Sequence, residues 1–273
     1  MNRRGRSIAL HGVLMAGGLV TLFPLLWMLS ASFMSNGEST IFPPHLVPHA
    51  ATLAQYRALF LRLNLGRAFL SSTIVAVMVT VSSVLFGSMA GYAFAKLRFG
   101  GRERIFGLLL IAIIVPPQVG MLPLFLLMKT LHLVNTYWGV IIPSMATVFG
   151  IFLIRQFMLS VPQELLEAAR IDGAGEFRIY WSVVMPLARP ILATLATFMF
   201  MSTWNDFMWP LIILSNQAHH TLPVALANLL GEHVLDVELM MAGSVVTVLP
   251  VLVLFLVLQR YYIAGLMAGS VKG

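Results

Sequence analysis

The chain has 273 residues, of which 59% are hydrophobic and only 10% are charged, whereas about 25% are charged in an average soluble protein. This composition excludes an ordinary soluble domain and indicates an integral membrane protein. The net charge of +7 would suit nucleic-acid binding in a soluble protein, but here the basic bias of cytoplasmic loops accounts for most of it, so we expect no nucleic-acid partner.

Long stretches without charged residues predict six membrane-spanning helices, because a helix needs about 20 apolar residues to cross a bilayer. The predicted spans cover residues 8–32, 69–95, 105–128, 138–157, 190–214 and 242–262. Lys and Arg accumulate on the cytoplasmic side of short loops, and a cytoplasmic amino terminus places 13 of the 17 basic residues on that side. The sequence therefore predicts an all-α membrane protein with both termini in the cytoplasm.

The first span follows Arg3, Arg4 and Arg6, a beginning that also occurs in signal peptides. Its apolar run is longer than the roughly 7 to 15 residues of a signal-peptide core, so we interpret it as a retained helix. In the external segment that follows, a periodic piece at residues 54–65 is typical of a short amphipathic helix at the membrane surface.

The second span has small residues at intervals of four, at Ser83, Gly87 and Gly91. This spacing places them on one face of a helix, where small side chains let two backbones approach closely. The stripe predicts helix packing, either with a neighbouring helix of this chain or with a second subunit.

The third span contains the adjacent prolines Pro116 and Pro117, which remove backbone donors and predict a kink or break near its middle. The kink has two interpretations. It is either purely structural, or it lets this region contribute to a solute path, for which Gln118 is a candidate residue. The fourth span is interrupted by Pro143 and Gly150.

The fifth span holds Trp204, Asn205 and Asp206. An ionisable residue inside a membrane usually faces protein or water and is a functional-site hypothesis by default, so Asn205 and Asp206 are candidates for the solute path. The alternative is that Asp206 lies near the outer surface, where it is solvated or caps a bent helix end.

The external segment at residues 215–241 has no Lys or Arg and is long for a plain connection, so we expect it to reach an external partner. His219 and His220 have no third ligand at a useful spacing, and the chain has no cysteine. We therefore expect no metal site.

A charged stretch at residues 160–190 stands between the fourth and fifth spans, on the predicted cytoplasmic side. Ser160 followed by Gln163 fits a capping box, which predicts a helix start near Val161. Gly173 is placed to end this helix in a left-handed turn, after about 12 residues.

The middle of this predicted helix carries the small residues Ala168 and Ala169, so another protein surface can approach closely, with Glu167 and Asp172 at the rim. The alternative is a helix that merely lies among lipid headgroups. A second amphipathic piece follows at residues 176–185, and prolines then turn the chain back towards the membrane.

The stretch also carries a family pattern. Glu167-Ala168-Ala169, then Asp172-Gly173-Ala174, and Pro186-Leu187 closed by Pro190 resemble the EAA loop of permease subunits in binding-protein-dependent ABC importers. Val183 and Met185 stand where that pattern usually has Ile and Leu. The segment WNDFMWPL at Trp204 and the ending LQRYYIAGLMAGSVKG look like the second membrane subunit of maltose-type carbohydrate importers.

The resemblance implies one transmembrane permease domain over residues 1–273, with a type I importer core at about 66–264. The EAA loop at 160–190 would form a coupling helix that docks on an ATPase subunit, and the tail at 260–273 would approach the ATPase dimer interface. The residues assigned to coupling are Glu167, Ala168, Ala169, Asp172, Gly173, Ala174 and Pro186.

The resemblance also implies the partners: a homologous second permease, an ATPase dimer, an external solute-binding protein and the bilayer of a bacterial inner membrane. The chain has no GxxxxGK[ST] phosphate loop, so ATP and magnesium are expected on the ATPase, with no cofactor or catalytic residue here. The implied solute is a carbohydrate, most simply an oligosaccharide of the maltose or trehalose type.

Two alternatives remain open at this point. One is an ABC importer for glycerol phosphate or another small polar solute. The other is an ion-driven secondary transporter that acts alone, against which stand the single intramembrane charge at Asp206 and the lack of matched halves.

Overall fold

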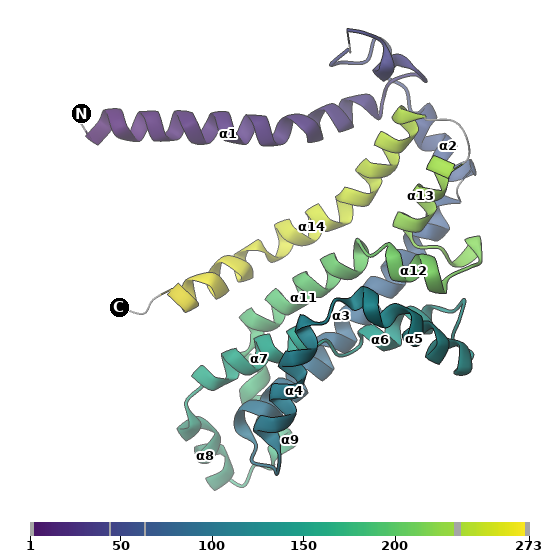
Figure 1. Cartoon of the computed structure of the whole chain (residues 1–273). Coiled ribbons are helices and arrows are strands. Elements are labelled where there is room, and N and C mark those ends of the chain that lie inside the picture. The colour runs from purple at the N-terminus through teal and green to yellow at the C-terminus, as the bar shows by residue number, and fades with distance from the viewer. Residues whose placement is uncertain (1–2, 44, 63, 232–235, 271–273) are drawn as a thin grey trace. The chain divides into compact units, whose positions relative to one another are not determined.

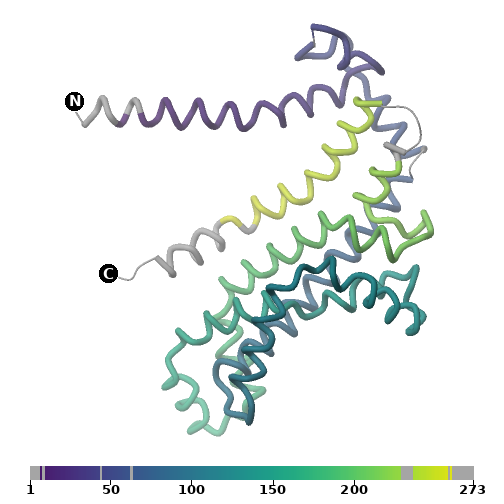
Figure 2. Tube along the Cα trace, viewed as in Figure 1, coloured from purple at the N-terminus to yellow at the C-terminus, as the bar shows by residue number. Residues whose placement is uncertain are grey.

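The computed structural model describes residues 3–43, 45–62, 64–231 and 236–270, with the backbone alone for residues 3–6, 8–9, 62, 229–231, 258 and 260–270. All regular structure in these ranges is helical (Figures 1 and 2). The chain divides into two compact units: unit 1 is Met1–Gly66 with Ala225–Pro250, and unit 2 is Arg67–Val224 with Val251–Gly273. A single permease domain over residues 1–273 stays a prediction.

Four stretches in the described ranges are long and apolar enough to cross a membrane: Leu10–Ala31, Leu65–Lys96, Tyr137–Ser160 and Val237–Val257. Two further helix pairs qualify if each counts as one bent span, Arg102–Ile114 with Pro117–Thr130 and Glu176–Leu187 with Arg189–Trp204. The predicted number of six corresponds to the count that includes both bent pairs, and the side of the membrane on which each end lies stays a prediction.

Unit 1 holds a polar clasp at the start of its last helix, around Glu238. The buried carboxylate of Glu238 accepts hydrogen bonds from the backbone N–H and the hydroxyl of Ser39, at 2.8 and 2.7 Å. Asn36 donates to Asp236 at 3.2 Å. These bonds tie the connection after the first helix to the segment 200 residues later in sequence. The unit is built from α1 (Arg3–Ala31), η1 (Glu38–Thr40), α2 (Ala54–Arg62) and parts of α13 (Leu222–Gly231) and α14 (Val237–Ser270).

Helix α2 confirms that the periodic piece after the first span is helical. Its placement at a membrane surface stays a prediction.

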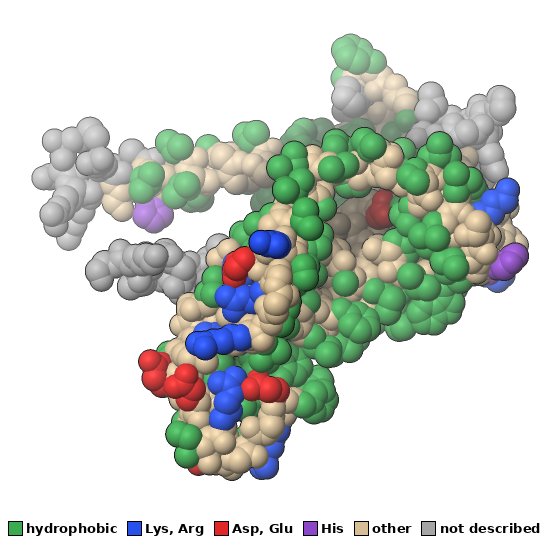
Figure 3. All heavy atoms as spheres, turned by 60° about the horizontal axis from the view of Figure 1, so that its bottom comes forward, with side chains coloured by type: hydrophobic (Ala, Val, Ile, Leu, Met, Phe, Trp, Pro, Cys, Tyr) green, Lys and Arg blue, Asp and Glu red, His purple; other side chains and the backbone are tan. Residues whose placement is uncertain are grey.

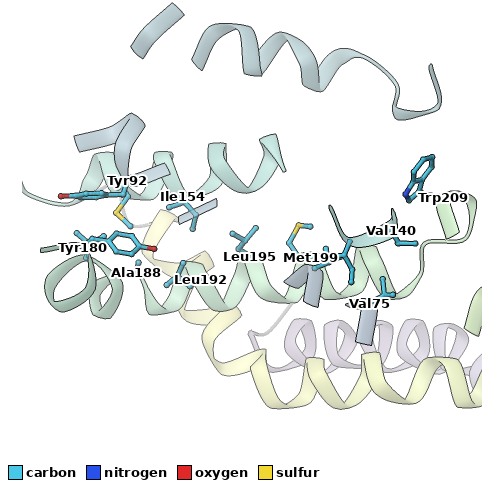
Figure 4. Packing of buried hydrophobic residues seen from close by; sticks show 14 of the residues in the cluster. Val75, Tyr92, Val140, Ile154, Tyr180, Ala188, Leu192, Leu195, Met199 and Trp209 are labelled. Carbon is cyan, nitrogen blue, oxygen red and sulfur yellow. The ribbon is translucent and has the colours of Figure 1, made fainter. Parts of the chain in front are cut away.

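Unit 2 is a bundle around an extensive buried apolar cluster (Figure 4). Side chains from distant parts of the chain meet in it, among them Val75, Ile154, Leu166 and Leu195. The helices of unit 2 are α3 (Leu65–Lys96), α4 (Arg102–Ile114), α5 (Pro117–Thr130), α6 (Tyr137–Ser144), α7 (Val148–Ser160), α8 (Gln163–Ile171), α9 (Glu176–Ile179), the π-helical turn η2 (Tyr180–Val184), α10 (Met185–Leu187), α11 (Arg189–Trp204), α12 (Met208–Ile213) and η3 (Gln217–His219).

The small-residue stripe of α3 packs against α7 of the same chain. A Cβ atom added at Gly91 would lie 2.7 Å from both Cβ and Cγ2 of Ile154, and one added at Gly87 would lie 3.7 Å from the backbone of Gly150. Ser83 is fully buried. The two backbones therefore approach closely where α3 carries no side chain. Of the two packing partners considered for this stripe, the structure shows the neighbouring helix of the same chain.

The paired prolines break the third span, as predicted. Helix α4 ends at Ile114, Pro116 adopts an extended conformation, and α5 begins at Pro117 with its axis turned by 105°. Val115 satisfies its N–H on the carbonyl of Ala112. The bend therefore follows from the missing proline N–H groups and the restriction on the residue before each proline.

In the fourth span, Pro143 lacks the N–H that would bond the carbonyl of Gly139 four residues earlier. The indole Nε1–H of Trp209 bonds this carbonyl instead, at 3.1 Å. A side chain from a distant helix thus replaces the backbone donor that proline removes, which is how helix breaks persist inside membranes.

The prediction of one continuous helix for the fifth span was wrong. Helix α11 ends at Trp204, and a separate short helix α12 begins at Met208. The amide of Asn205 donates from Nδ2 to the carbonyl of Met201 at 2.8 Å, and the N–H of Asp206 bonds Thr203 at 3.2 Å. Local bonding by Asn therefore competes with continued helix at this point.

We expect Gly91→Ala to destabilise the protein by about 1–3 kcal/mol, because the new methyl group overlaps Ile154 and forces α3 away from α7. Thermal unfolding in detergent, followed by tryptophan fluorescence, measures the effect as a lower Tm. Gly107→Ala is the matched control, since nothing lies within 4 Å of a Cβ added there in α4. Equal Tm values for the two variants would contradict the close approach of the helices.

Candidate functional site

Helix α8 starts the charged stretch, but not with the predicted capping box. Pro162 occupies the cap position and makes no side-chain hydrogen bond to α8. Ser160 is the last residue of α7, and its hydroxyl donates to the carbonyl of Phe157 at 2.7 Å. Ser160 is therefore committed to the preceding helix, and α8 has 9 residues in place of about 12.

The end of α8 is as predicted. Gly173 has φ of +81°, a left-handed conformation that glycine adopts without a steric cost. The N–H of Gly173 bonds the carbonyl of Arg170, and the N–H of Ala174 bonds the carbonyl of Ala169, both at 3.0 Å. This pair of bonds is a Schellman motif, which ends the helix and satisfies its last carbonyls.

One face of α8 is open. Glu164, Glu167, Ala168 and Ile171 recur at intervals of three and four, and all four are exposed. Ile171 is 86% exposed although it is fully apolar. Ile171 was missed by the sequence reasoning, although its spacing from Glu167 and Ala168 places it on the same face.

The other face of α8 holds it to the bundle. Leu166 is completely buried in the apolar cluster of unit 2, and Ala169 packs against that cluster. Of the two small residues predicted to form an accessible surface, only Ala168 is exposed. Ala168 faces outward, and Ala169 serves as a contact with the core.

A shared carboxylate fastens α8 to its neighbours. Glu176 Oε1 accepts from the Arg170 guanidinium at 2.7 Å, and Glu176 Oε2 accepts from the phenol of Tyr92 at 2.8 Å. Arg170 belongs to α8, Glu176 to α9 and Tyr92 to α3. The ammonium of Lys96 adds a bond of 2.6 Å to the carbonyl of Val161, just before α8. We call Tyr92, Arg170 and Glu176 the Glu176 lock.

The second helical piece of the stretch supports the lock. The rings of Tyr92 and Tyr180 lie 5.7 Å apart and appear side by side in Figure 4, and the Tyr180 hydroxyl is 2.7 Å from the hydroxyl of Ser88. Tyr180 begins the π-helical turn η2. The axis then bends by 80° around the buried Ala188 into α11, so the chain turns between the two prolines as predicted, and its return to the membrane stays a prediction.

The predicted coupling residues thus fall into three groups. Glu167, Ala168, Asp172 and Gly173 are exposed at α8 or its end, and Ala169 and Ala174 pack against the core. Pro186 is exposed on the separate helix α10. Figure 3, turned towards the end of the molecule that carries α8 and α9, shows acidic and basic side chains gathered there and hydrophobic ones along the flanks.

The candidate path residues lie in two places. The carboxylate of Asp206 lies beside the backbone N–H groups of Met208 and Trp209 at the start of α12, where the positive end of the helix favours a negative charge. Asn205 is exposed beside it, and Gln118 is exposed near the start of α5. No hydrogen bond joins Gln118 to Asn205 or Asp206 within the described ranges.

The external segment after α12 is anchored in part. His219 lies edge-on to Tyr137 at 5.4 Å, and its Nδ1 is 3.4 Å from the amide oxygen of Asn135. Of its three acids, Asp236 and Glu238 belong to the clasp of unit 1, and Glu232 lies outside the described residues.

The chain is similar in sequence to known transport proteins. A family model described as "Binding-protein-dependent transport system inner membrane component" matches residues 83–266. The arabinooligosaccharides transport system permease protein AraQ of Halalkalibacterium halodurans is 40% identical over 261 residues, with 93% of this chain and 92% of AraQ covered. The sn-glycerol-3-phosphate transport system permease protein UgpE of Yersinia pestis is 32% identical, with 97% of each covered.

Among solved structures, a bacterial ABC transporter involved in the import of the acidic polysaccharide alginate contains a similar chain. The TM-score is 0.83 at 26% sequence identity, and the match covers 96% of this chain and 99% of that one. The similarity therefore extends over the whole fold as well as over the charged stretch.

We expect Glu176→Gln to loosen α8, because the amide loses the ion pair with Arg170. The side chains of Arg170 and Glu176 are 35% and 46% exposed, so the effect should be about 1 kcal/mol or less, equivalent to hydrogen exchange up to about fivefold faster in α8. Exchange mass spectrometry of the peptide covering residues 163–171 measures it.

Glu167→Gln is the matched control for this experiment, since it removes the same charge from the open face of α8. If both variants exchange at the rate of the unmodified protein, the Glu176 lock does not hold α8.

Proposed function

The chain belongs to the family of binding-protein-dependent transport system inner membrane components, and on this premise we propose that it is the permease subunit of an ATP-driven carbohydrate importer. It is a multi-pass protein of the inner membrane. Its relatives are transport permeases and not enzymes. The chain would supply half of the translocation path, and a homologous permease subunit would supply the other half.

The open face of α8 is the observation that carries the coupling proposal. A short helix with an exposed Ile171, an open Ala168 and acidic residues at its rim suits insertion into a cleft of an ATPase subunit. The Glu176 lock and the buried Leu166 attach this helix to α3 and α9, so a displacement of α8 would pass to the membrane helices. Closure of the ATPase dimer would thereby shift the population between inward-open and outward-open states.

The remaining partners follow from the family. ATP and magnesium would be held by the ATPase dimer, since this chain has no phosphate-binding loop. The tail at residues 260–273 would approach the ATPase dimer interface; its side chains lie outside the described residues. The external segment at 215–241 would contact a solute-binding protein.

The solute we propose is an oligosaccharide. AraQ, at 40% identity, is named for arabino-oligosaccharides, and the alginate importer carries a polysaccharide. Glycerol phosphate is the second candidate, because UgpE covers nearly all of this chain at 32% identity. The ligand of the solute-binding protein that co-purifies with the complex decides between them. None of the relatives named above supports an ion-driven transporter that acts alone.

We expect single cysteines at Ala168 and Ile171 to cross-link to the ATPase subunit in membranes, because both positions lie on the open face of α8. The chain has no native cysteine, so each label is unique. Ala169 is a poorer probe, since it packs against the core.

A cysteine at Gly100 is the matched control, because it is exposed on the same predicted side of the membrane and has nothing within 4 Å of an added Cβ. The coupling assignment fails if neither α8 position cross-links in a complex that transports solute.

We also propose that Asp206 lines the solute path. In proteoliposomes that hold the complete importer, Asp206→Asn should lower ATP-dependent oligosaccharide uptake by roughly tenfold, as expected for one lost charged hydrogen bond, and leave ATP hydrolysis less affected. Uptake of labelled solute and release of phosphate measure the two effects in one preparation.

A second variant, Asp206→Ala, distinguishes a role of Asp206 in the solute path from a role in stabilising the start of α12. Asn keeps an acceptor beside the N–H groups of Met208 and Trp209, and Ala does not. Normal uptake by the Asn variant with impaired uptake by the Ala variant would assign Asp206 to capping α12 alone.

A further inference from the structure

The connection between α3 and α4 forms an open pocket that the coupling proposal does not use. Its volume is about 590 Å³, and three arginines contribute to its wall with only one acidic residue. The lining residues are Arg98, Phe99, Gly101, Arg102, Glu103 and Arg104.

The positive charge of this pocket is not neutralised by its neighbours. The only lining carboxylate, that of Glu103, is already shared by Arg102 at 2.8 Å and Arg155 at 3.3 Å. Arg98 and Arg104 are exposed, and neither has an ion-pair partner among the described residues. The positive end of the α4 dipole, which begins at Arg102, adds to the same field. The pocket therefore attracts an anion.

The surface beside the pocket is apolar. On α4, the exposed fractions of Ile105, Leu108 and Ile111 are 46%, 67% and 60%, and these residues follow one another turn by turn away from the arginines. Phe99 is 42% exposed at the rim. A soluble phosphate would meet the arginines alone, whereas a phospholipid would meet the arginines with its headgroup and the apolar residues with its acyl chains.

We propose that this pocket binds the phosphate of an anionic phospholipid whose acyl chains lie along Ile105, Leu108 and Ile111. Basic clusters next to the cytoplasmic end of a spanning helix recognise anionic headgroups, and each basic residue contributes about 1 kcal/mol. The distribution of Lys and Arg predicts that this connection faces the cytoplasmic leaflet. The site is separate from the open face of α8, so its loss and the loss of ATPase docking are distinguishable.

Photolabelling of the full chain in nanodiscs tests the proposal. The probe is phosphatidylglycerol with a photoactivatable group on one acyl chain, in a phosphatidylcholine bilayer, and labelled peptides are mapped by mass spectrometry. We expect label on α4 between Ile105 and Ile111, displaced by unlabelled phosphatidylglycerol. Arg98→Gln combined with Arg104→Gln should reduce this labelling by roughly thirtyfold, the effect of two lost basic residues.

The matched control combines Arg57→Gln with Lys129→Gln, which removes two exposed basic residues elsewhere and should leave the labelling of α4 unchanged. Labelling of the remaining helices in the same samples reports whether each variant is folded in the bilayer.

Three outcomes would overturn the proposal. Equal labelling of α4 in the two double variants would show that the arginines do not select the lipid. Equal labelling by a phosphatidylcholine probe would show no headgroup recognition. Displacement by soluble glycerol 3-phosphate at the same concentration as the lipid would assign the pocket to a free anion.

Discussion

The carboxylate of Glu176 joins the charged loop to the membrane helices. Its two oxygens are used by different elements, one by the guanidinium of Arg170 and the other by the phenol of Tyr92. A helix of nine residues is too short to be stable alone in water, so α8 depends on such tertiary contacts for its existence. The contacts are made on one face only, with Leu166 buried beneath them, and the opposite face stays free to bind. The same contacts that form the helix thus determine which face is available to a partner.

The membrane helices are broken in places where other parts of the chain satisfy the backbone. Pro143 leaves the carbonyl of Gly139 without its helical donor, and the indole of Trp209 provides one. Trp209 is positioned for this because α11 ends at Trp204 and the chain restarts as α12. The interruption at Asn205 is therefore part of the packing of α6, since a continuous helix through this point would point the indole elsewhere.

The sequence predicted correctly those features that depend only on the residues at the position itself. The left-handed turn at Gly173 and the break at Pro116 and Pro117 both follow from the backbone limits of glycine and proline, and both were correct. The capping box failed because Ser160 had two possible partners, and only the extent of α7 decides between them. The exposure of Ala168 and the partial burial of Ala169 depend on where α3 and α9 lie, and no pattern within the loop contains that information.

The arrangement of α11 suggests how an event at α8 reaches the far end of the bundle. Leu166 of α8 belongs to the same buried cluster as Val184, which precedes the 80° bend into α11, and Ala188, which lies at the bend. Because protein interiors are close-packed, a displacement of Leu166 would pass through this cluster and would not merely compress it. Helix α11 has 16 residues and is therefore about 24 Å long, and it ends where Asn205 and Asp206 begin. If α8 is the coupling helix, as proposed, a tilt of α11 would carry its movement to the candidate path residues without any change in the helices' own hydrogen bonds.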